Sequence, residues 1–100
     1  MAAVGDYFRS RCLPTEVRVR AYSEPPGGCG DRLATLEPGT YFGPAERVVQ
    51  NHGFITVLVR GFWINVGKFD GRGAYIRYVP FAYEVPRREV SSWKTRGWHD

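Results

Sequence analysis

Residues 61–79 read GFWINVGKFDGRGAYIRYV, and this pattern predicts a β-hairpin. Two apolar-rich runs, Phe62–Val66 and Ala74–Val79, are separated by the pair Asp70-Gly71. An Asp-Gly pair between such runs is a strong hairpin signal, because both residues tolerate the positive φ angles of a tight turn. Gly73 adds a second flexible point, so a loop with a bulge fits the sequence as well as a two-residue turn does.

Outward from this hairpin, the chain alternates short strand patterns with turn signals. Residues 17–22 have the period-two alternation of a half-buried strand, and 54–59 form an apolar, β-branched run that we expect to be the most buried strand. Further extended segments are expected over 33–36, 41–42, 47–49 and 81–85. Five or six short antiparallel strands without a long helix predict an all-β fold, a small barrel.

The hairpin and the strands before it resemble bacterial-type SH3 domains. The similar residues are Trp63, Val66, Asp70-Gly71, Gly73, Tyr75-Ile76 and Tyr78-Val79, together with the stretches 17–20 and 33–40. The resemblance implies an SH3-like barrel over residues 15–85, with short extensions over 1–14 and 86–100. It also implies a non-catalytic module that binds a peptide or the cell wall, with the loop over 23–31 contributing to the ligand groove.

The two extensions carry weaker patterns. Residues 6–13 suit either a short helix, capped by Asp6 and ended before Pro14, or an extended arm that packs Tyr7 and Phe8 on the barrel. Residues 86–93 suit one or two helical turns.

Length and composition predict one compact domain. A chain of 100 residues with 43% hydrophobic and 15% aromatic residues is able to bury one compact core. No apolar run is long enough to cross a bilayer. The first residues lack the basic region and apolar core of a secretory signal, so we expect a cytoplasmic protein.

Neither charge nor cysteine content points to a cofactor. The net charge of +4 is spread among acidic residues, which indicates a mildly basic surface and no nucleic-acid arm. Two cysteines, Cys12 and Cys29, form neither a disulfide framework nor a zinc motif, so we expect reduced thiols and no metal.

Catalytic motifs are also missing from the sequence. It contains no GxSxG, HExxH, P-loop or dinucleotide fingerprint. His52 lies in the turn Asn51-His52-Gly53, where we expect a solvent-exposed histidine without a catalytic role. A barrel of this size has no interior for a substrate. We therefore expect no enzymatic activity.

The aromatic residues suggest the function. Strand alternation that points Phe62 and Ile76 inward would place their neighbours on the surface. We predict a shallow partner-binding surface formed by Tyr22, Glu24, Asp31, Trp63 and Tyr75. Exposed aromatic grooves suit extended peptides, so a protein or peptide partner is our leading hypothesis.

Three alternatives stay open at this stage. The aromatic residues are equally suited to covering the barrel and packing against the terminal segments. A basic β-barrel with exposed rings also suits nucleic acid, for which the candidate residues are Arg18, Arg20, Arg60, Lys68, Arg72 and Arg77. A structural subunit that self-associates through a strand edge is the third.

Overall fold

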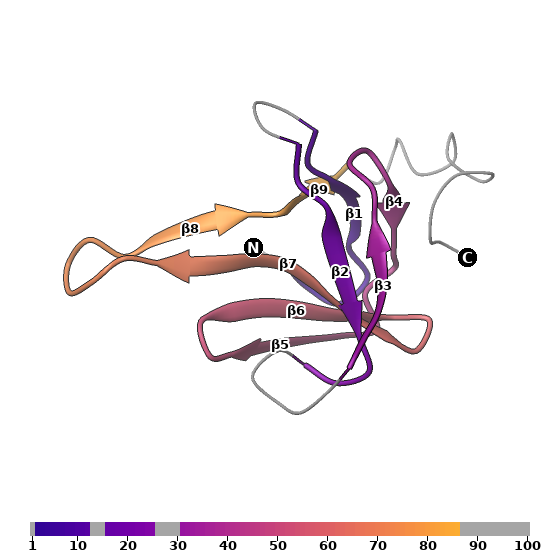
Figure 1. The fold of residues 1–100 in the computed structure, drawn as a ribbon, viewed down its shortest axis with the longest axis horizontal. Helices are drawn as coiled ribbons and strands as arrows, with labels where there is room; N and C mark the ends of the chain where they lie inside the picture. Colours follow the sequence, from indigo (N-terminus) through magenta and orange to yellow (C-terminus); the bar gives the residue numbers. More distant parts are fainter. Residues whose placement is uncertain (1, 13–15, 26–30, 87–100) are drawn as a thin grey trace.

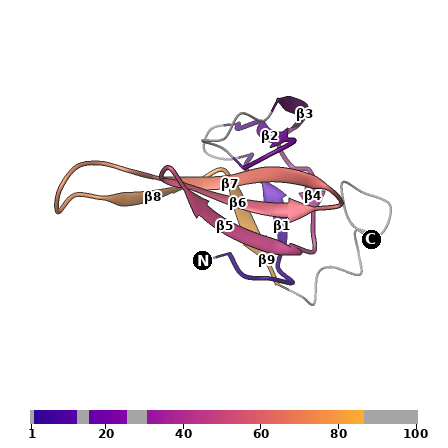
Figure 2. The ribbon, with the colours of Figure 1, turned by 90° about the horizontal axis from the view of Figure 1, so that it is seen from below.

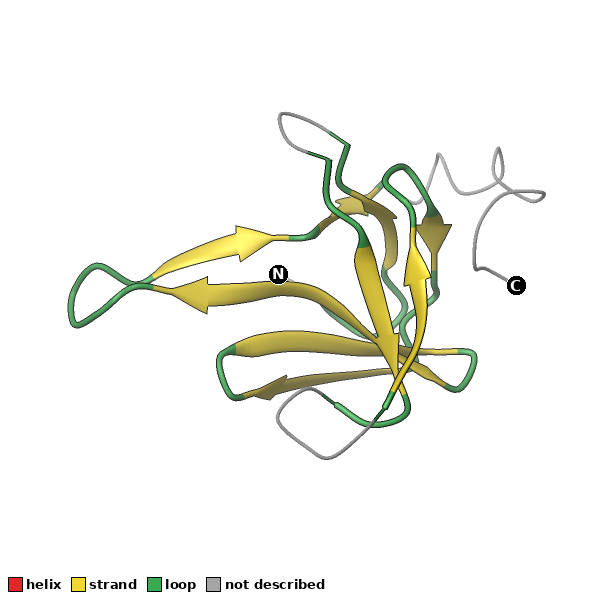
Figure 3. Ribbon diagram, viewed as in Figure 1, coloured by secondary structure: helices red, strands yellow, loops and turns green. Residues whose placement is uncertain are grey.

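A computed structural model describes residues 2–12, 16–25 and 31–86, and in these residues the fold is all-β (Figures 1 and 3). The described part of the chain holds nine strands and no helix, which confirms the all-β class, although the strands outnumber the five or six expected. In chain order these are β1 (Tyr7–Ser10), β2 (Val19–Tyr22), β3 (Arg32–Leu36), β4 (Tyr41–Phe42), β5 (Arg47–Asn51), β6 (Phe54–Val59), β7 (Phe62–Asp70), β8 (Arg77–Pro80) and β9 (Ala82–Val85).

The strands form two antiparallel sheets. The larger has the order β3-β2-β7-β6-β5, with β8 also paired to β7, and the smaller has the order β4-β1-β9. Figure 2 shows β5, β6 and β7 side by side, with β7 and β8 continuing beyond them as a projecting hairpin. The long strand β7 therefore joins the body of the fold to this hairpin.

Two tight turns build the meander β5-β6-β7. His52 and Gly53 connect Asn51 to Phe54 with φ of 50° and 81°, and Arg60 and Gly61 connect β6 to β7 with φ of 51° and 84°. Positive φ at both central residues is the type I′ geometry, whose twist matches that of antiparallel strands. The turn predicted over 51–53 is confirmed.

The core lies between the two sheets. Alternate residues of β2, β6 and β7 face it, and the smaller sheet contributes Phe8 and Phe42, whose rings stack with centroids 5.4 Å apart. The fully or almost fully buried apolar residues are Phe8, Val19, Ala21, Leu36, Phe42, Ala45, Ile55, Val57, Val59, Ile64, Val66 and Ala82. The strand expected over 54–59 is, as predicted, among the most buried.

The N-terminal segment is part of the fold and no mere extension. Of the two conformations left open for residues 6–13, the extended one is observed over the described residues 6–12, and the helix is wrong there. Strand β1 is the central strand of the smaller sheet, and buried Ser10 donates a hydrogen bond to the Glu37 carbonyl (2.6 Å) and accepts one from the Thr40 amide (2.8 Å). These bonds hold the Glu37–Thr40 turn against β1.

The β7–β8 hairpin is present, but its loop is longer than the sequence suggested. Asp70 pairs with Arg77, so residues 71–76 form the loop and the strand expected from Ala74 begins only at Arg77. Ile76, expected to point inward, is 60% exposed. That expectation is wrong because the flexible Gly71 and Gly73 end the ladder at Asp70.

Two earlier expectations concern residues outside the described part of the chain. The C-terminal extension beyond residue 86, including the helical turns expected over 86–93, and Cys29 both fall there. Among the described residues, no helix has the length and apolar character that crossing a membrane requires.

Candidate binding groove over β2

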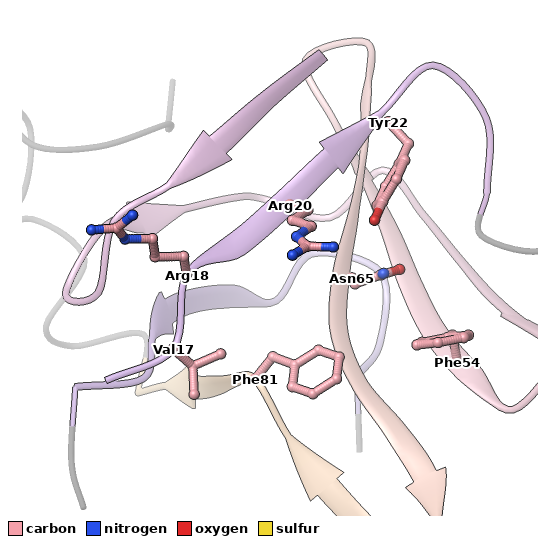
Figure 4. Close-up of a pocket in the computed structure, with 7 residues that line it drawn as sticks. All are labelled: Val17, Arg18, Arg20, Tyr22, Phe54, Asn65 and Phe81. Carbon is pink, nitrogen blue, oxygen red and sulfur yellow. The ribbon is translucent and has the colours of Figure 1, made fainter. Parts of the chain in front are cut away.

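The candidate site is a concave pocket of about 230 Å³ on the face of the larger sheet that points away from the core. Figure 4 shows the Tyr22 hydroxyl pointing toward the Asn65 amide, with the ring of Phe54 beyond it and the ring of Phe81 on the other side. We call this pocket the β2 groove, and its lining residues are Val17, Arg18, Arg20, Tyr22, Phe54, Asn65 and Phe81.

Strand pairing explains why these residues meet. Ala21 lies opposite Ile64, and both are buried in the core. Tyr22 lies opposite Trp63, and directly opposed residues share a face, so Tyr22 and Trp63 lie on the groove side. Alternation then places Arg20 on the same side of β2.

Asn65 forms the polar floor of the groove. It is only 7% exposed, and its Oδ1 accepts a hydrogen bond from Thr56 Oγ1 at 3.0 Å, across the β6–β7 register. Within the described residues, no group accepts a hydrogen bond from its Nδ2. The amide therefore offers its N–H donors to whatever occupies the groove.

The entrance to the groove is positively charged. It continues into a shallower depression over β2 and β3, lined by Glu16, Val17, Arg18, Arg20, Arg32, Thr35 and Pro38. Arg18 forms an ion pair with Glu37, with Nε 3.2 Å from Oε2. In the described part of the chain, Arg20 and Arg32 have no such partner. Two guanidinium groups are therefore available at this surface.

Four of the five residues predicted for partner binding lie at or near this face. Tyr22 lines the groove, and Trp63 is its cross-strand neighbour. Trp63 is half-buried, and the Arg47 guanidinium lies 5.7 Å from its ring centroid. Glu24 and Asp31 are exposed just beyond β2, where the Asp31 amide donates to Ser23 Oγ at 2.9 Å.

The fifth predicted residue, Tyr75, is not part of this face. It is 87% exposed in the loop of the β7–β8 hairpin, whereas Trp63 lies at the opposite end of β7. At about 3.3 Å per residue, the length of β7 puts these two residues about 20 Å or more apart. The structure therefore does not unite Trp63 and Tyr75 in one surface.

Sequence reasoning missed Phe54, Asn65 and Phe81 as groove residues. A signal was available for Asn65, because a polar residue interrupts an apolar strand there, and Thr56 interrupts the neighbouring one. A buried polar side chain is usually paired. No local pattern points to Phe81, whose amide donates to the Val66 carbonyl at 2.8 Å and so brings it beside β7.

No cluster suited to a metal ion occurs among the residues that the structure describes. His52 is exposed in its turn, and Cys12 lies half-buried beside Gly39. Burial raises the pKa of the Tyr78 hydroxyl above 10.0, and the Glu84 carboxylate raises it further. Tyr78 lies outside the β2 groove.

Comparison with known proteins gives no family assignment. No protein-family model, no curated protein and no solved structure matches this chain. The function is therefore argued from the groove itself.

Proposed function

We propose that this protein is a non-catalytic, SH3-like interaction module that binds a segment of a partner protein in the β2 groove. The observation that carries the proposal is the convergence of three aromatic rings, from Tyr22, Phe54 and Phe81, around the buried amide of Asn65. Apolar walls with a few convergent polar groups are the usual composition of a ligand site. Large aromatic side chains also dominate the energies of protein interfaces.

The extended shape of the groove favours a segment of a large ligand. The groove encloses about 230 Å³ and shares Val17, Arg18 and Arg20 with the depression over β2 and β3, which adds about 740 Å³ of more open space along the sheet. A peptide that places one side chain in the groove and lays its neighbours along β2 would use both parts.

The distribution of basic residues makes nucleic acid the second candidate. Of the six candidate phosphate contacts, Arg18 and Arg20 line the groove. Lys68 lies on β7 opposite Phe54, Arg60 lies in the β6–β7 turn, and Arg72 and Arg77 lie at the far end of the hairpin. A strand of nucleic acid would need a continuous basic track along its phosphates, so we favour a peptide.

Peptide selection followed by NMR tests the proposal. A displayed random-peptide library would be selected on the immobilised protein, and the enriched peptides titrated into ¹⁵N-labelled protein. We expect the largest shifts in the backbone amides of Arg20 and Tyr22 and in the side-chain amide of Asn65. Peptides whose shifts centre instead on residues 71–76, or on β3 and β5 at the two ends of the larger sheet, would contradict the proposal.

A matched pair of variants separates the groove from the hairpin. Tyr22→Ala removes a groove wall, whereas Tyr75→Ala removes a tyrosine of the same size from the hairpin loop. We expect Tyr22→Ala to lower the affinity for the selected peptides at least tenfold and Tyr75→Ala to leave that affinity unchanged. Steep loss of affinity with rising salt, together with preference for single-stranded DNA, would favour the nucleic-acid candidate. Concentration-dependent dimers would favour self-association.

A further inference from the structure

Three hydrogen-bond donors meet in the β2 groove. They are the Arg20 guanidinium, the Asn65 Nδ2 group and the Tyr22 hydroxyl, and all three line the same pocket (Figure 4). Within the described residues, none of the three donates to a protein acceptor. Asn65 is more than nine-tenths buried, and its amide lines the groove, where Nδ2 is accessible to a ligand.

The positive charge around the β2 groove favours a negatively charged hydrogen-bond acceptor in the ligand. Arg18, Arg20 and Arg32 line the groove and its shallow continuation, against Glu16 alone among the lining acids. Arg18 is neutralised by Glu37, but Arg20 and Arg32 have no ion pair in the described part of the chain. A carboxylate accepts bidentate hydrogen bonds from a guanidinium and has further lone pairs for the Asn65 amide.

The walls of the groove select an apolar neighbour for that carboxylate. Phe54, Phe81 and Val17 form the apolar part of the lining. Apolar side chains in contact with such rings are removed from water, which stabilises the complex. The same pocket thus offers hydrogen-bond donors for an anion and an apolar surface for a hydrocarbon group.

We propose that the β2 groove recognises a carboxylate adjacent to an apolar, preferably aromatic, side chain of a partner protein, an inference that rests on the proposed function. Two sources supply this chemistry. One is an Asp or Glu side chain next to an aromatic residue within a segment, and the other is the α-carboxylate of a C-terminal aromatic residue. Arg20 and Asn65 hold the carboxylate in either case, and Phe54 and Phe81 hold the ring.

Small probes test the chemistry without knowledge of the partner. N-acetylphenylalanine carries the α-carboxylate, the dipeptide amide N-acetyl-Phe-Asp-NH₂ carries the side-chain carboxylate, and N-acetylphenylalaninamide and N-acetyl-Phe-Asn-NH₂ are their uncharged controls. Each is titrated into the full-length ¹⁵N-labelled protein while the Asn65 side-chain NH₂ and the Arg20 Nε–H signals are followed. We expect saturable shifts of both signals with at least one carboxylate probe, and at least tenfold weaker binding of its uncharged control.

Two arginine variants provide the matched control. Arg20→Gln removes the groove guanidinium, and Arg72→Gln makes the same change in the hairpin loop, far from the groove. Because Arg20→Gln removes a charge-assisted hydrogen bond to the carboxylate, we expect it to lower the affinity for the carboxylate probe at least tenfold. Arg72→Gln should bind it as the unchanged protein does. Unaltered amide spectra elsewhere show that both variants are folded.

Each remaining outcome overturns the inference. If the uncharged controls bind as well as the acids, or if Arg20→Gln binds as well as Arg72→Gln, the groove does not read a carboxylate. If selected peptides bind in the groove but lack acids and C-terminal carboxylates, the inference fails while the proposed function stands. If no peptide shifts groove signals, both fail. Tighter binding of a single-stranded oligonucleotide in the groove would assign it to a different partner class.

Discussion

Thr56 Oγ1 lies 3.0 Å from Asn65 Oδ1 and donates a hydrogen bond to it between strands β6 and β7. Both side chains are buried on the face of the sheet that carries the groove. Because Thr56 occupies Oδ1, the orientation of the amide is fixed, and Nδ2 is the group presented to a ligand. One cross-strand pair therefore serves the stability of the sheet and the chemistry of the groove.

Replacing one partner of this hydrogen bond should lower the free energy of unfolding, and replacing both partners with apolar residues should lower it less than the single losses would suggest. We expect Thr56→Val to destabilise the protein by about 1–3 kcal/mol, because it leaves a buried acceptor without its donor. The double variant Thr56→Val/Asn65→Leu should lose less than the sum of the single variants, since two apolar groups pack without an unpaired polar atom. Urea denaturation measures all three. Strictly additive losses would show that the two side chains do not interact.

Trp63 should contribute an intermediate amount to stability. It is half-buried, with its ring next to the Arg47 guanidinium and its strand position opposite Tyr22. We expect Trp63→Ala to cost about 1–3 kcal/mol, below the roughly 3–5 kcal/mol of a fully buried tryptophan. Chemical denaturation gives the value. A loss under about 0.5 kcal/mol would place the ring on the free surface, as for ordinary exposed positions.

The two glycines of the hairpin loop should respond differently to substitution. Gly71 has φ of 126°, and a Cβ at this position would collide with the carbonyl oxygen of Tyr75. Gly73 has φ of 56° and nothing within 4 Å. We expect Gly71→Val to cost about 1–3 kcal/mol. Gly73→Asn should be almost neutral, because asparagine tolerates the left-handed conformation. Equal melting temperatures for the two variants would contradict this loop geometry.

Tyr78 makes the stability depend on alkaline pH. Burial is the main cause that raises the pKa of its hydroxyl above 10.0, with the Glu84 carboxylate second, so the folded state retains the proton longer than the unfolded chain. The resulting stability is complete below pH 10.0 and is lost as the pH rises from there through the folded-state pKa. Unfolding curves at increasing pH should therefore decline less steeply for Tyr78→Phe. If the stability of the unchanged protein and of Tyr78→Phe fell equally with rising pH, groups other than Tyr78 would be responsible.

Local sequence patterns were sufficient for most of the larger sheet. Alternation identified β2, the apolar run identified β6, and the turn residues His52 and Gly53 marked the β5–β6 connection. These signals work because each is generated within a few residues, by side-chain period or by φ preference. The same signals wrongly predict that the strand includes Ile76. The pairing of Asp70 with Arg77 sets the register of this hairpin and leaves Ile76 in the loop that contains Gly71 and Gly73.

The smaller sheet and the groove depend on contacts between distant segments. Strand β1 pairs with β4 and β9, and its local signals, Asp6 and Pro14, fitted a helix as well as a strand. Only part of the β2 groove was predictable, because some of its residues are brought there by contacts between distant segments. Tyr22 and Trp63 follow from alternation on their strands, whereas Phe81 reaches the groove only because the chain after β8 stays hydrogen-bonded to β7.

The position of β1 also bears on how the chain folds as it is synthesised. Tyr7–Ser10 leave the ribosome before the other described strands, but their partners in β9 are made last among them. Until then Phe8 has no complete sheet around it, and pairing over so long a separation closes slowly. The meander β5-β6-β7 has only local turns and is able to form first. A nascent chain stalled before Ala82 would therefore pair β1 with β4 alone and leave the other edge of β1 open to chaperones.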